Sequence, residues 1–303
     1  MWNILICTST FDKKNIDIKL LKKKVELKFN KFGRKLKENE LYNLIDQRTV
    51  GIISGTEKIT KKILDKGKNL QVISRCGTGT DNIDKSSIKN IKIFKTDKEP
   101  VPAVAEFVVT QVLSTLKNSY LHNYYLKNSN WKKIKGKMLT NSNVGIIGFG
   151  KIGKQIQLLL KPFKCKITIY DPNIRKFSSI KNLNFILKKS EIITLNIPFN
   201  KKNKNFINAQ KLSQMSKNTI LVNCSRGGLI DEKALYKKLK KNKNFKAILD
   251  CFDIEPYNGK LIKLENAILS PHVASYTKEI RDKMERNSFI SCVKNINFKK
   301  LNE

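Results

Sequence analysis

Histidine is scarce in this chain, and the marks of several common protein classes are missing. Two histidines occur among 303 residues, so few side chains can act as a base near neutral pH. No uninterrupted apolar run approaches the roughly 18 residues that a membrane helix requires. Residues 1–7 lack a basic leader and a small-residue cleavage site, which predicts a first strand and no signal peptide. We therefore expect a cytoplasmic protein without membrane contact.

The cysteines give no sign of a metal site or a disulfide framework. Six are scattered along the chain, and no CxxC pair occurs. Several lie in apolar, strand-like segments, where cysteine behaves as a small buried hydrophobe. A reducing compartment and no bound metal are expected.

Acidic residues are few, and the charge is one-sided. The chain has 61 Lys and Arg against 25 Asp and Glu, a net charge of +36. Such a charge raises the question of a nucleic-acid partner. Here the excess is mostly lysine, is spread through every segment, and accompanies Asn and Ile, whose codons share an A/T-rich character. Because binding sites usually concentrate charge on one face, we attribute the charge to composition and do not expect nucleic-acid binding.

Apolar runs alternate with amphipathic stretches along the whole chain, which predicts parallel sheets flanked by helices. The length allows two domains. Strands are predicted at 3–8, 25–30, 49–54, 70–74 and 91–95, and in a second series at 144–148, 166–170, 192–196, 219–223, 246–251 and 267–270. Helices are predicted at 58–66, 84–90 and 103–126, and a last helix at 276–295 should return to the first domain.

A glycine-rich turn opens the second series. Residues 144–148 form a buried-strand pattern that runs through Gly148, Gly150 and Gly153 into an amphipathic helix. The first glycine permits the tight turn, the second lets the backbone approach a pyrophosphate, and the third lets helix and strand pack closely. Lys151 and Ile152 begin the helix, whose amides suit an anion. A dinucleotide site is predicted here.

An acidic residue follows the next strand. Asp171 lies 18 positions beyond Gly153, close to the spacing of an acid that binds the ribose hydroxyls. A carboxylate there repels a 2′-phosphate, so NAD is favoured over NADP. The alternative is that Asp171 caps a turn before Pro172.

Three later segments, 223–228, 250–256 and 270–275, lie at predicted strand ends, where ligands bind in open parallel sheets. Together with the glycine-rich turn and segment 75–84, their order and spacing resemble those of the D-isomer-specific 2-hydroxyacid dehydrogenases over nearly the whole chain. The resemblance implies an α/β fold of two doubly wound domains. A Rossmann NAD-binding domain, 102–276, would be inserted into a flavodoxin-like substrate-binding domain, 1–101 with 277–303. A small anionic substrate and a homodimer are expected.

Oxidising a secondary alcohol requires a base for the hydroxyl proton. His122 falls in a predicted helix among polar residues and is expected at the surface or an interface. His272 falls in a family motif and is expected to be the base. By resemblance, Glu255 pairs with His272, orients its ring and raises its pKa, and Arg226 holds the substrate carboxylate and the C2 oxygen. The alternative for Glu255 is a turn residue before Pro256. The alternative for Arg226 is an ordinary surface arginine.

The resemblance also implies the rest of the cofactor site. Asp250 is expected to contact the nicotinamide carboxamide, and the backbone should line the cofactor at Cys224, Ser225, Ala274 and Ser275. The formate-oxidising branch of the family pairs its histidine with glutamine, so Glu255 argues against that branch.

Substrate binding is expected at Arg75, Gly77, Thr78 and Gly79, which resemble the family's carboxylate loop. An arginine just before that loop contacts phosphate in the phosphoglycerate dehydrogenases of the family, so 3-phosphoglycerate is the expected substrate. A generic exposed arginine is the alternative. Segment 95–102 departs from the family's usual turn, which leaves glyoxylate, hydroxypyruvate or another 2-hydroxy acid open. No segment matches the carboxy-terminal regulatory domain of some members, so serine feedback through it is not expected.

Three classes of function therefore compete. The first is the NAD-dependent oxidoreductase. The second is a non-catalytic NAD(H)-sensing protein on the same fold, which can retain the same three residues. The third is a charge-driven nucleic-acid binder, for which the sequence offers no clustered basic motif.

Overall fold

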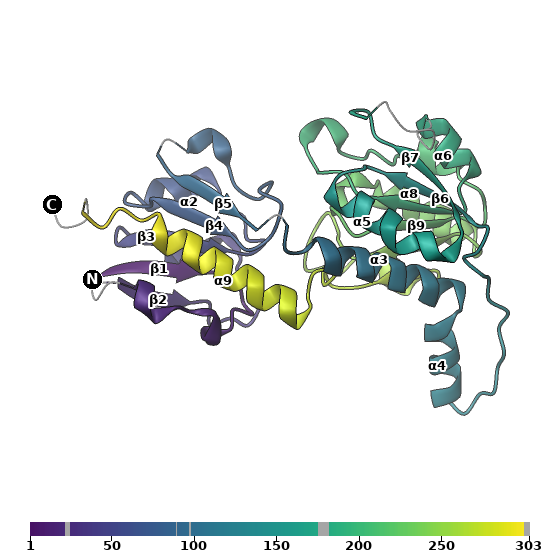
Figure 1. Cartoon of the computed structure of the whole chain (residues 1–303), viewed down its shortest axis with the longest axis horizontal. Coiled ribbons are helices and arrows are strands. Elements are labelled where there is room, and N and C mark those ends of the chain that lie inside the picture. Colours follow the sequence, from purple (N-terminus) through teal and green to yellow (C-terminus); the bar gives the residue numbers. More distant parts are fainter. Residues whose placement is uncertain (22–24, 89, 97, 175–181, 300–303) are drawn as a thin grey trace. The chain divides into compact units, whose positions relative to one another are not determined.

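The computed structural model describes the chain except residues 22–24, 89, 97, 175–181 and 300–303. The chain divides into two compact units, unit 1 with Met1–Pro100 and Tyr276–Glu303, and unit 2 with Val101–Ser275. Each unit has one parallel sheet with helices against it, as Figure 1 shows. The predicted fold class, two parallel-sheet α/β domains, is confirmed.

The sheet of unit 1 has the strand order β2-β1-β3-β4-β5. Its order reverses between β1 and β3, a switch point of the kind that binds ligands beyond the carboxyl ends of the strands. Helices α1 and α2 lie over one core cluster, and α9 packs on the other with Phe289, Cys292 and Val293. The bounds are β1 Trp2–Ile6, β2 Val25–Phe29, β3 Thr49–Ser54, β4 Val72–Arg75, β5 Lys92–Lys95, α1 Glu38–Leu44, α2 Lys61–Lys66 and α9 Lys278–Lys294.

The sheet of unit 2 has the order β11-β10-β9-β8-β6-β7 and reverses between β6 and β8. Helices α3 and α5 lie side by side on one core cluster, and α6, α7 and α8 belong to the other. The bounds are β6 Asn143–Ile147, β7 Lys166–Tyr170, β8 Ile192–Leu195, β9 Ile220–Asn223, β10 Lys246–Leu249, β11 Ala267–Leu269, α3 Val101–Leu116, α4 Ser119–Lys127, α5 Lys151–Leu160, α6 Leu183–Lys189, α7 Ala209–Gln214 and α8 Glu232–Lys241.

Two helix predictions were wrong in detail. The helix predicted over 103–126 is broken, because Asn118 adopts a left-handed conformation with φ 53° between α3 and α4. Asparagine tolerates this conformation better than most residues, and the backbone changes direction there. The helix predicted over 84–90 is a 3-10 turn, Lys85–Ser87, in the described part of the segment.

The short helix α4 and the irregular residues 128–142 form an arm on unit 2. Figure 1 shows α4 leaving the end of α3 and the chain running back toward unit 2. None of the nine residues of α4 is buried, and the arm exposes Tyr124, Leu126, Trp131 and Met138. The arm therefore presents apolar side chains that no described part of this chain covers.

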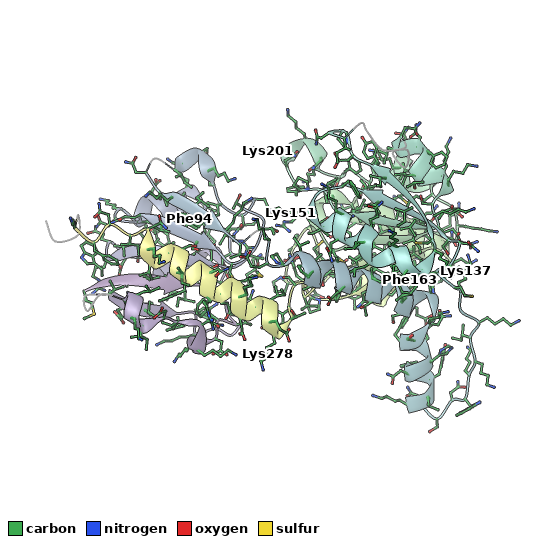
Figure 2. The ribbon with its side chains drawn as sticks, viewed as in Figure 1. Phe94, Lys137, Lys151, Phe163, Lys201 and Lys278 are labelled. Carbon is green, nitrogen blue, oxygen red and sulfur yellow. The ribbon has the colours of Figure 1, made fainter. Side chains whose placement is uncertain are left out.

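Lysine side chains extend from many elements, as Figure 2 shows for Lys137, Lys151, Lys201 and Lys278. These four positions come from both units and from helices and loops alike. Within the residues described, no helix is both long enough and apolar enough to cross a membrane.

Candidate active site

The three glycines of the dinucleotide turn meet three different surroundings. A side chain on Gly148, which has φ +90°, would meet the carbonyl oxygen of Asn196 at 2.6 Å, and one on Gly153 would meet the carbonyl of Gly148 at 2.2 Å. A side chain on Gly150 would meet nothing within 4 Å. Gly148 and Gly153 are thus required by packing of this chain on itself, whereas Gly150 faces open space.

Open space at Gly150 fits a pyrophosphate at this turn. Gly150 is the N-cap of α5, and no side chain of the described residues caps that helix end by a hydrogen bond, which is the kind of helix start that suits an anion. Lys151 and Ile152 occupy the first turn of α5. These features fit NAD, whose phosphates would lie against the residues 148–153.

Asp171 follows β7 and reaches the same turn. Its Oδ2 accepts a hydrogen bond from the backbone N–H of Phe149 at 2.8 Å, and its Oδ1 accepts one from Asn173 at 2.9 Å. The carboxylate thus lies beside the glycine turn, where an adenosine ribose would lie. It also holds the local turn, as the alternative interpretation expected, and its ribose contact stays a prediction.

His272 and Glu255 are brought together at the carboxyl end of the sheet. Nδ1 of His272 lies 2.9 Å from Oε1 and 3.1 Å from Oε2 of Glu255. Oε1 also accepts the backbone N–H of Phe252 at 3.1 Å. The carboxylate therefore fixes the ring through Nδ1, with the proton on that nitrogen, while Nε2 makes no hydrogen bond among the described residues.

The backbone of His272 is strained. It has φ 57°, a left-handed conformation that is uncommon for residues other than glycine and asparagine. Such strain persists where the surroundings hold it and clusters at functional sites.

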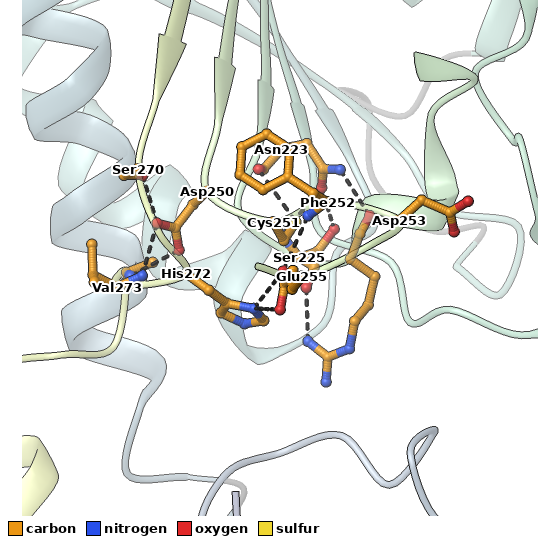
Figure 3. A network of polar contacts seen from close by, with 12 residues as sticks. Asn223, Ser225, Asp250, Cys251, Phe252, Asp253, Glu255, Ser270, His272 and Val273 are labelled. Carbon is orange, nitrogen blue, oxygen red and sulfur yellow. Dashed lines mark hydrogen bonds and ion pairs between the residues drawn. The ribbon is translucent and has the colours of Figure 1, made fainter. Parts of the chain in front are cut away.

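Asp250 holds the backbone of His272 in this conformation. Figure 3 shows its carboxylate between Ser270 and Val273, two residues that flank His272 in the sequence. Oδ1 accepts Ser270 Oγ at 2.5 Å and Val273 N at 2.8 Å, and Oδ2 accepts Ala274 N at 2.8 Å. Burial raises the pKa of the Asp250 carboxyl, and these hydrogen bonds oppose the rise. Asp250 thus fixes the loop that carries His272.

This role of Asp250 was missed in the sequence. We had expected a nicotinamide contact, which stays a prediction. The signal available was an aspartate at the buried end of one strand and a short polar loop at the end of its neighbour, because β10 and β11 pair in parallel.

The loop of Arg226 follows β9 and packs on the loop of Glu255. A side chain on Gly227 would meet the backbone carbon of Phe252 at 1.9 Å, and one on Gly228 would meet the ring of Phe199 at 2.6 Å. Gly227 therefore lets the loops of Arg226 and Glu255 lie in contact, and Gly228 makes room for the Phe199 ring.

Asn223 organises the Arg226 loop from beneath. Its amide donates to the carbonyl of Arg226 at 2.8 Å, and its Oδ1 accepts the backbone N–H of Ser225 at 3.1 Å. Arg226 Nη1 donates to the carbonyl of Ser225 at 2.7 Å. Asn223 is 1% exposed, so these bonds form away from solvent and hold the arginine's backbone in place.

The other residues expected to line the cofactor lie in the same loops. Ala274 is buried, and Ser225 and Ser275 are half-buried. Burial raises the pKa of the Cys224 and Cys251 thiols well above the usual range, so neither is a thiolate nucleophile at neutral pH. No group of three or more His, Cys, Asp or Glu side chains in the described chain could hold a metal ion.

His122 lies elsewhere, on α4 of the arm. Its Nε2 accepts the backbone N–H of Ile134 at 3.2 Å. This bond ties α4 to the returning segment of the arm.

The expected substrate loop lies in unit 1, at the end of β4. Gly77 has φ +146°, and its N–H donates to Thr96 Oγ1 at 2.8 Å. Thr78 and Gly79 are half-buried. Arg75 is 6% exposed, and its Nη1 donates to the carbonyl of Cys76. Arg75 is thus buried against its own loop, which excludes the alternative that it is a generic exposed residue.

A second buried group behind this loop was not predicted. Glu57 is 2% exposed and accepts the N–H of Gly55 at 2.6 Å. Burial raises its pKa, and the charge of Arg75 acts against the rise. Glu57 and Arg75 therefore interact beneath the glycine loop.

Comparison with known proteins identifies the class. Residues 109–274 match the family model described as D-isomer specific 2-hydroxyacid dehydrogenase, NAD binding domain. The chain belongs to this family and is an NAD-dependent oxidoreductase.

Individual relatives carry several names. The chain is 34% identical over 271 residues to a hydroxypyruvate reductase of Thermotoga maritima, which covers 86% of this chain and 88% of the relative. It is 35% identical over 256 residues to a D-3-phosphoglycerate dehydrogenase of Methanocaldococcus jannaschii, which covers 80% of this chain and 49% of the relative, so it spans about half of that protein. The NAD+-bound 3-phosphoglycerate dehydrogenase of Entamoeba histolytica shares the fold, with a TM-score of 0.81 at 21% identity over 100% of this chain and 96% of the other.

Proposed function

We propose that this dehydrogenase interconverts D-3-phosphoglycerate and 3-phosphohydroxypyruvate, with His272, Glu255 and Arg226 as its catalytic residues. The observation that carries the chemistry is the contact of His272 Nδ1 with the Glu255 carboxylate at 2.9 Å. This contact positions His272, one of the two histidines in the chain, as an acid–base group paired with Glu255.

Each residue has a separate task. When bound, NAD accepts the hydride of the alcohol carbon and returns it in the reverse reaction. His272 Nε2 takes the hydroxyl proton, and the Glu255 carboxylate stabilises the imidazolium that forms. The Arg226 guanidinium donates to the C2 oxygen and polarises it. Asp250 keeps the His272 loop in the strained conformation that presents the ring.

One fact supports the phosphorylated substrate, because proteins named D-3-phosphoglycerate dehydrogenase are among the relatives. The loop Gly77–Gly79, which we propose as the carboxylate site, has the buried charge of Arg75 behind it. That charge favours the carboxylate of any 2-oxo acid at the loop.

Hydroxypyruvate or glyoxylate is the second candidate. Arg75 directs Nη1 to the carbonyl of Cys76, so that donor is used within the loop and is not presented to a phosphate. The hydroxypyruvate reductase named above is similar over 88% of its length.

Steady-state reduction of 3-phosphohydroxypyruvate, hydroxypyruvate and glyoxylate with NADH separates the candidates. We expect kcat/KM for 3-phosphohydroxypyruvate to exceed the others at least about tenfold, the effect of one charge-assisted contact. Equal or reversed preference would assign the second candidate. Absence of turnover with all three would contradict both and favour the NAD(H)-sensing role.

We further propose that the chain forms a homodimer through the arm of unit 2. A nine-residue helix that buries none of its residues is not stable by itself. A second copy would cover it and offer an identical arm in return. Light scattering should give the mass of a dimer, and Leu126→Ser with Trp131→Ser should give that of a monomer. An unchanged mass would contradict the arm as the interface.

A further inference from the structure

Arg281 lies on α9, close to the carboxyl end of β1 in unit 1. Its Nη2 lies 3.3 Å from Thr8 Oγ1 and 3.2 Å from Thr10 Oγ1, and both threonines follow β1. β1 borders the point where the strand order of this sheet reverses. Ligands of open parallel sheets bind at such a point, so Arg281 is at the expected ligand edge of unit 1.

A buried carboxylate holds the guanidinium in place. Nη2 contacts Glu285 Oε1 at 2.6 Å, and the Glu285 side chain is 1% exposed against 16% for Arg281. Oε2 of Glu285 is fixed in turn by the N–H of Asp12 at 2.8 Å and by Asn15 Nδ2 at 3.0 Å. The arginine is therefore positioned before any ligand arrives, which lowers the entropic cost of binding one.

The guanidinium retains unused donors. Among the described residues, neither Nη1 nor Nε of Arg281 makes a hydrogen bond, and Nε is buried. A buried donor without a partner is costly. An anion with several oxygens is the kind of ligand that satisfies a planar guanidinium.

Arg281 also acts on the proposed substrate loop. The thiol of Cys76, the residue before Gly77, is buried, which raises its pKa, and the charges of Arg281 and Arg75 both oppose that rise. The charges of two arginines therefore act at the loop, Arg75 from β4 and Arg281 from α9. Arg75 is the more buried, at 6%, and Arg281 has donors to spare.

We infer that Arg281 binds the phosphate of the substrate and distinguishes phosphorylated from unphosphorylated 2-oxo acids, an inference that rests on the proposed function. The glycine loop binds the carboxylate end, and Arg281 binds the opposite, dianionic end. Phosphate recognition is thereby assigned to α9, a helix far in sequence from the loop, instead of to Arg75.

The test compares Arg281→Gln with Arg286→Gln, which removes an exposed arginine from the same helix. Arg281→Gln should lower kcat/KM for 3-phosphohydroxypyruvate about 10- to 150-fold, the effect of a charge-assisted contact. Hydroxypyruvate and glyoxylate should change less than about threefold. Arg286→Gln should leave all three substrates nearly unchanged.

Loss of Arg281 leaves Glu285 buried without its cation, so the single variant can lose stability. The double variant Arg281→Gln with Glu285→Gln avoids this. Asp12 and Asn15 both donate to one oxygen, Oε2, and a glutamine oxygen can accept both bonds. The double variant should fold and show the same selective loss.

The outcomes separate the inference from the proposed function. A parent protein that reduces none of the three substrates overturns the proposed function. In that case binding of 3-phosphoglycerate, measured by calorimetry, still tests Arg281, because it should be lost in the double variant and kept in Arg286→Gln. Equal losses for all substrates, no loss in the double variant, or the same loss in Arg286→Gln would each overturn the inference.

Discussion

Replacing Asp250 by asparagine should separate the activity of this enzyme from its stability. The carboxylate is 1% exposed and accepts hydrogen bonds from Ser270, Val273 and Ala274. Asparagine has nearly the same shape and carries one acceptor oxygen. Its amide nitrogen would face one of these three donors, and at least one bond of the clamp would be lost.

Two effects on stability oppose each other. A charge-assisted hydrogen bond contributes about 1.5 to 3 kcal/mol, and burying an ion costs several kcal/mol. Burial is the first cause of the raised pKa of Asp250. A raised pKa means that the folded protein disfavours the charged carboxylate, so the cost of burying the charge exceeds the gain from the hydrogen bonds. Folding stability from this group is therefore fully present at low pH and is lost as pH rises through the folded pKa. Asp250→Asn should be as stable as the parent near pH 7, or slightly more stable.

Activity should fall nevertheless. His272 is held at φ 57°, and strain of this kind amounts to about 1 to 3 kcal/mol. If the loop relaxes, the productive conformation becomes about 5- to 150-fold less populated, and kcat should fall by the same factor. The affinity for NADH should change little.

Urea unfolding at about pH 5 and about pH 8 measures the first effect, and steady-state kinetics with NADH fluorescence titration measures the second. Asp253→Asn is the matched control, because Asp253 is exposed in the neighbouring loop. A variant with full kcat would refute the clamp. A loss of more than about 2 kcal/mol of stability near pH 8 would show that the hydrogen bonds outweigh the burial of the charge.

Three further predictions concern the base and the cofactor. His272→Gln should reduce turnover by on the order of 100-fold or more while NADH still binds, and near-normal kcat would remove the residue from the mechanism. Asp171→Ala should weaken NAD binding much more than NADP binding, and a parent enzyme that uses both cofactors equally would contradict the assigned ribose contact. Gly150→Val should block NADH binding with little change in thermal unfolding, since its new side chain enters open space; retained NADH affinity would show that the cofactor does not approach this residue.

The strands could be predicted well from the sequence. All eleven predicted strands are present among the described residues, with ends within two residues of those observed. Short apolar runs between polar turns are a local property of the chain, and buried parallel strands consist of such runs. The helix over 103–126 was less predictable, because its apolar pattern continues past Asn118, whose left-handed backbone breaks it.

The site was predictable where it rests on motifs and less so where it rests on contacts between distant segments. His272 and Glu255 were placed together through family motifs. The clamp by Asp250 joins residues 20 to 24 positions apart, and the Arg281 contact with Thr8 spans 273 positions. No local pattern encodes such distances. The burial of Arg75 likewise depends on how the glycine loop folds over its guanidinium.

The return of α9 to unit 1 has a consequence for the order in which this protein acquires its structure. Unit 2 occupies a continuous stretch, Val101–Ser275, whereas the sheet of unit 1 comes before it and α9 after it. During synthesis, the face of that sheet which Phe289, Cys292 and Val293 cover stays without its helix until the whole of unit 2 has been made. Unit 2 can therefore complete its core first. Until then the nascent unit 1 has an apolar face uncovered, and exposed apolar surface of this kind favours aggregation.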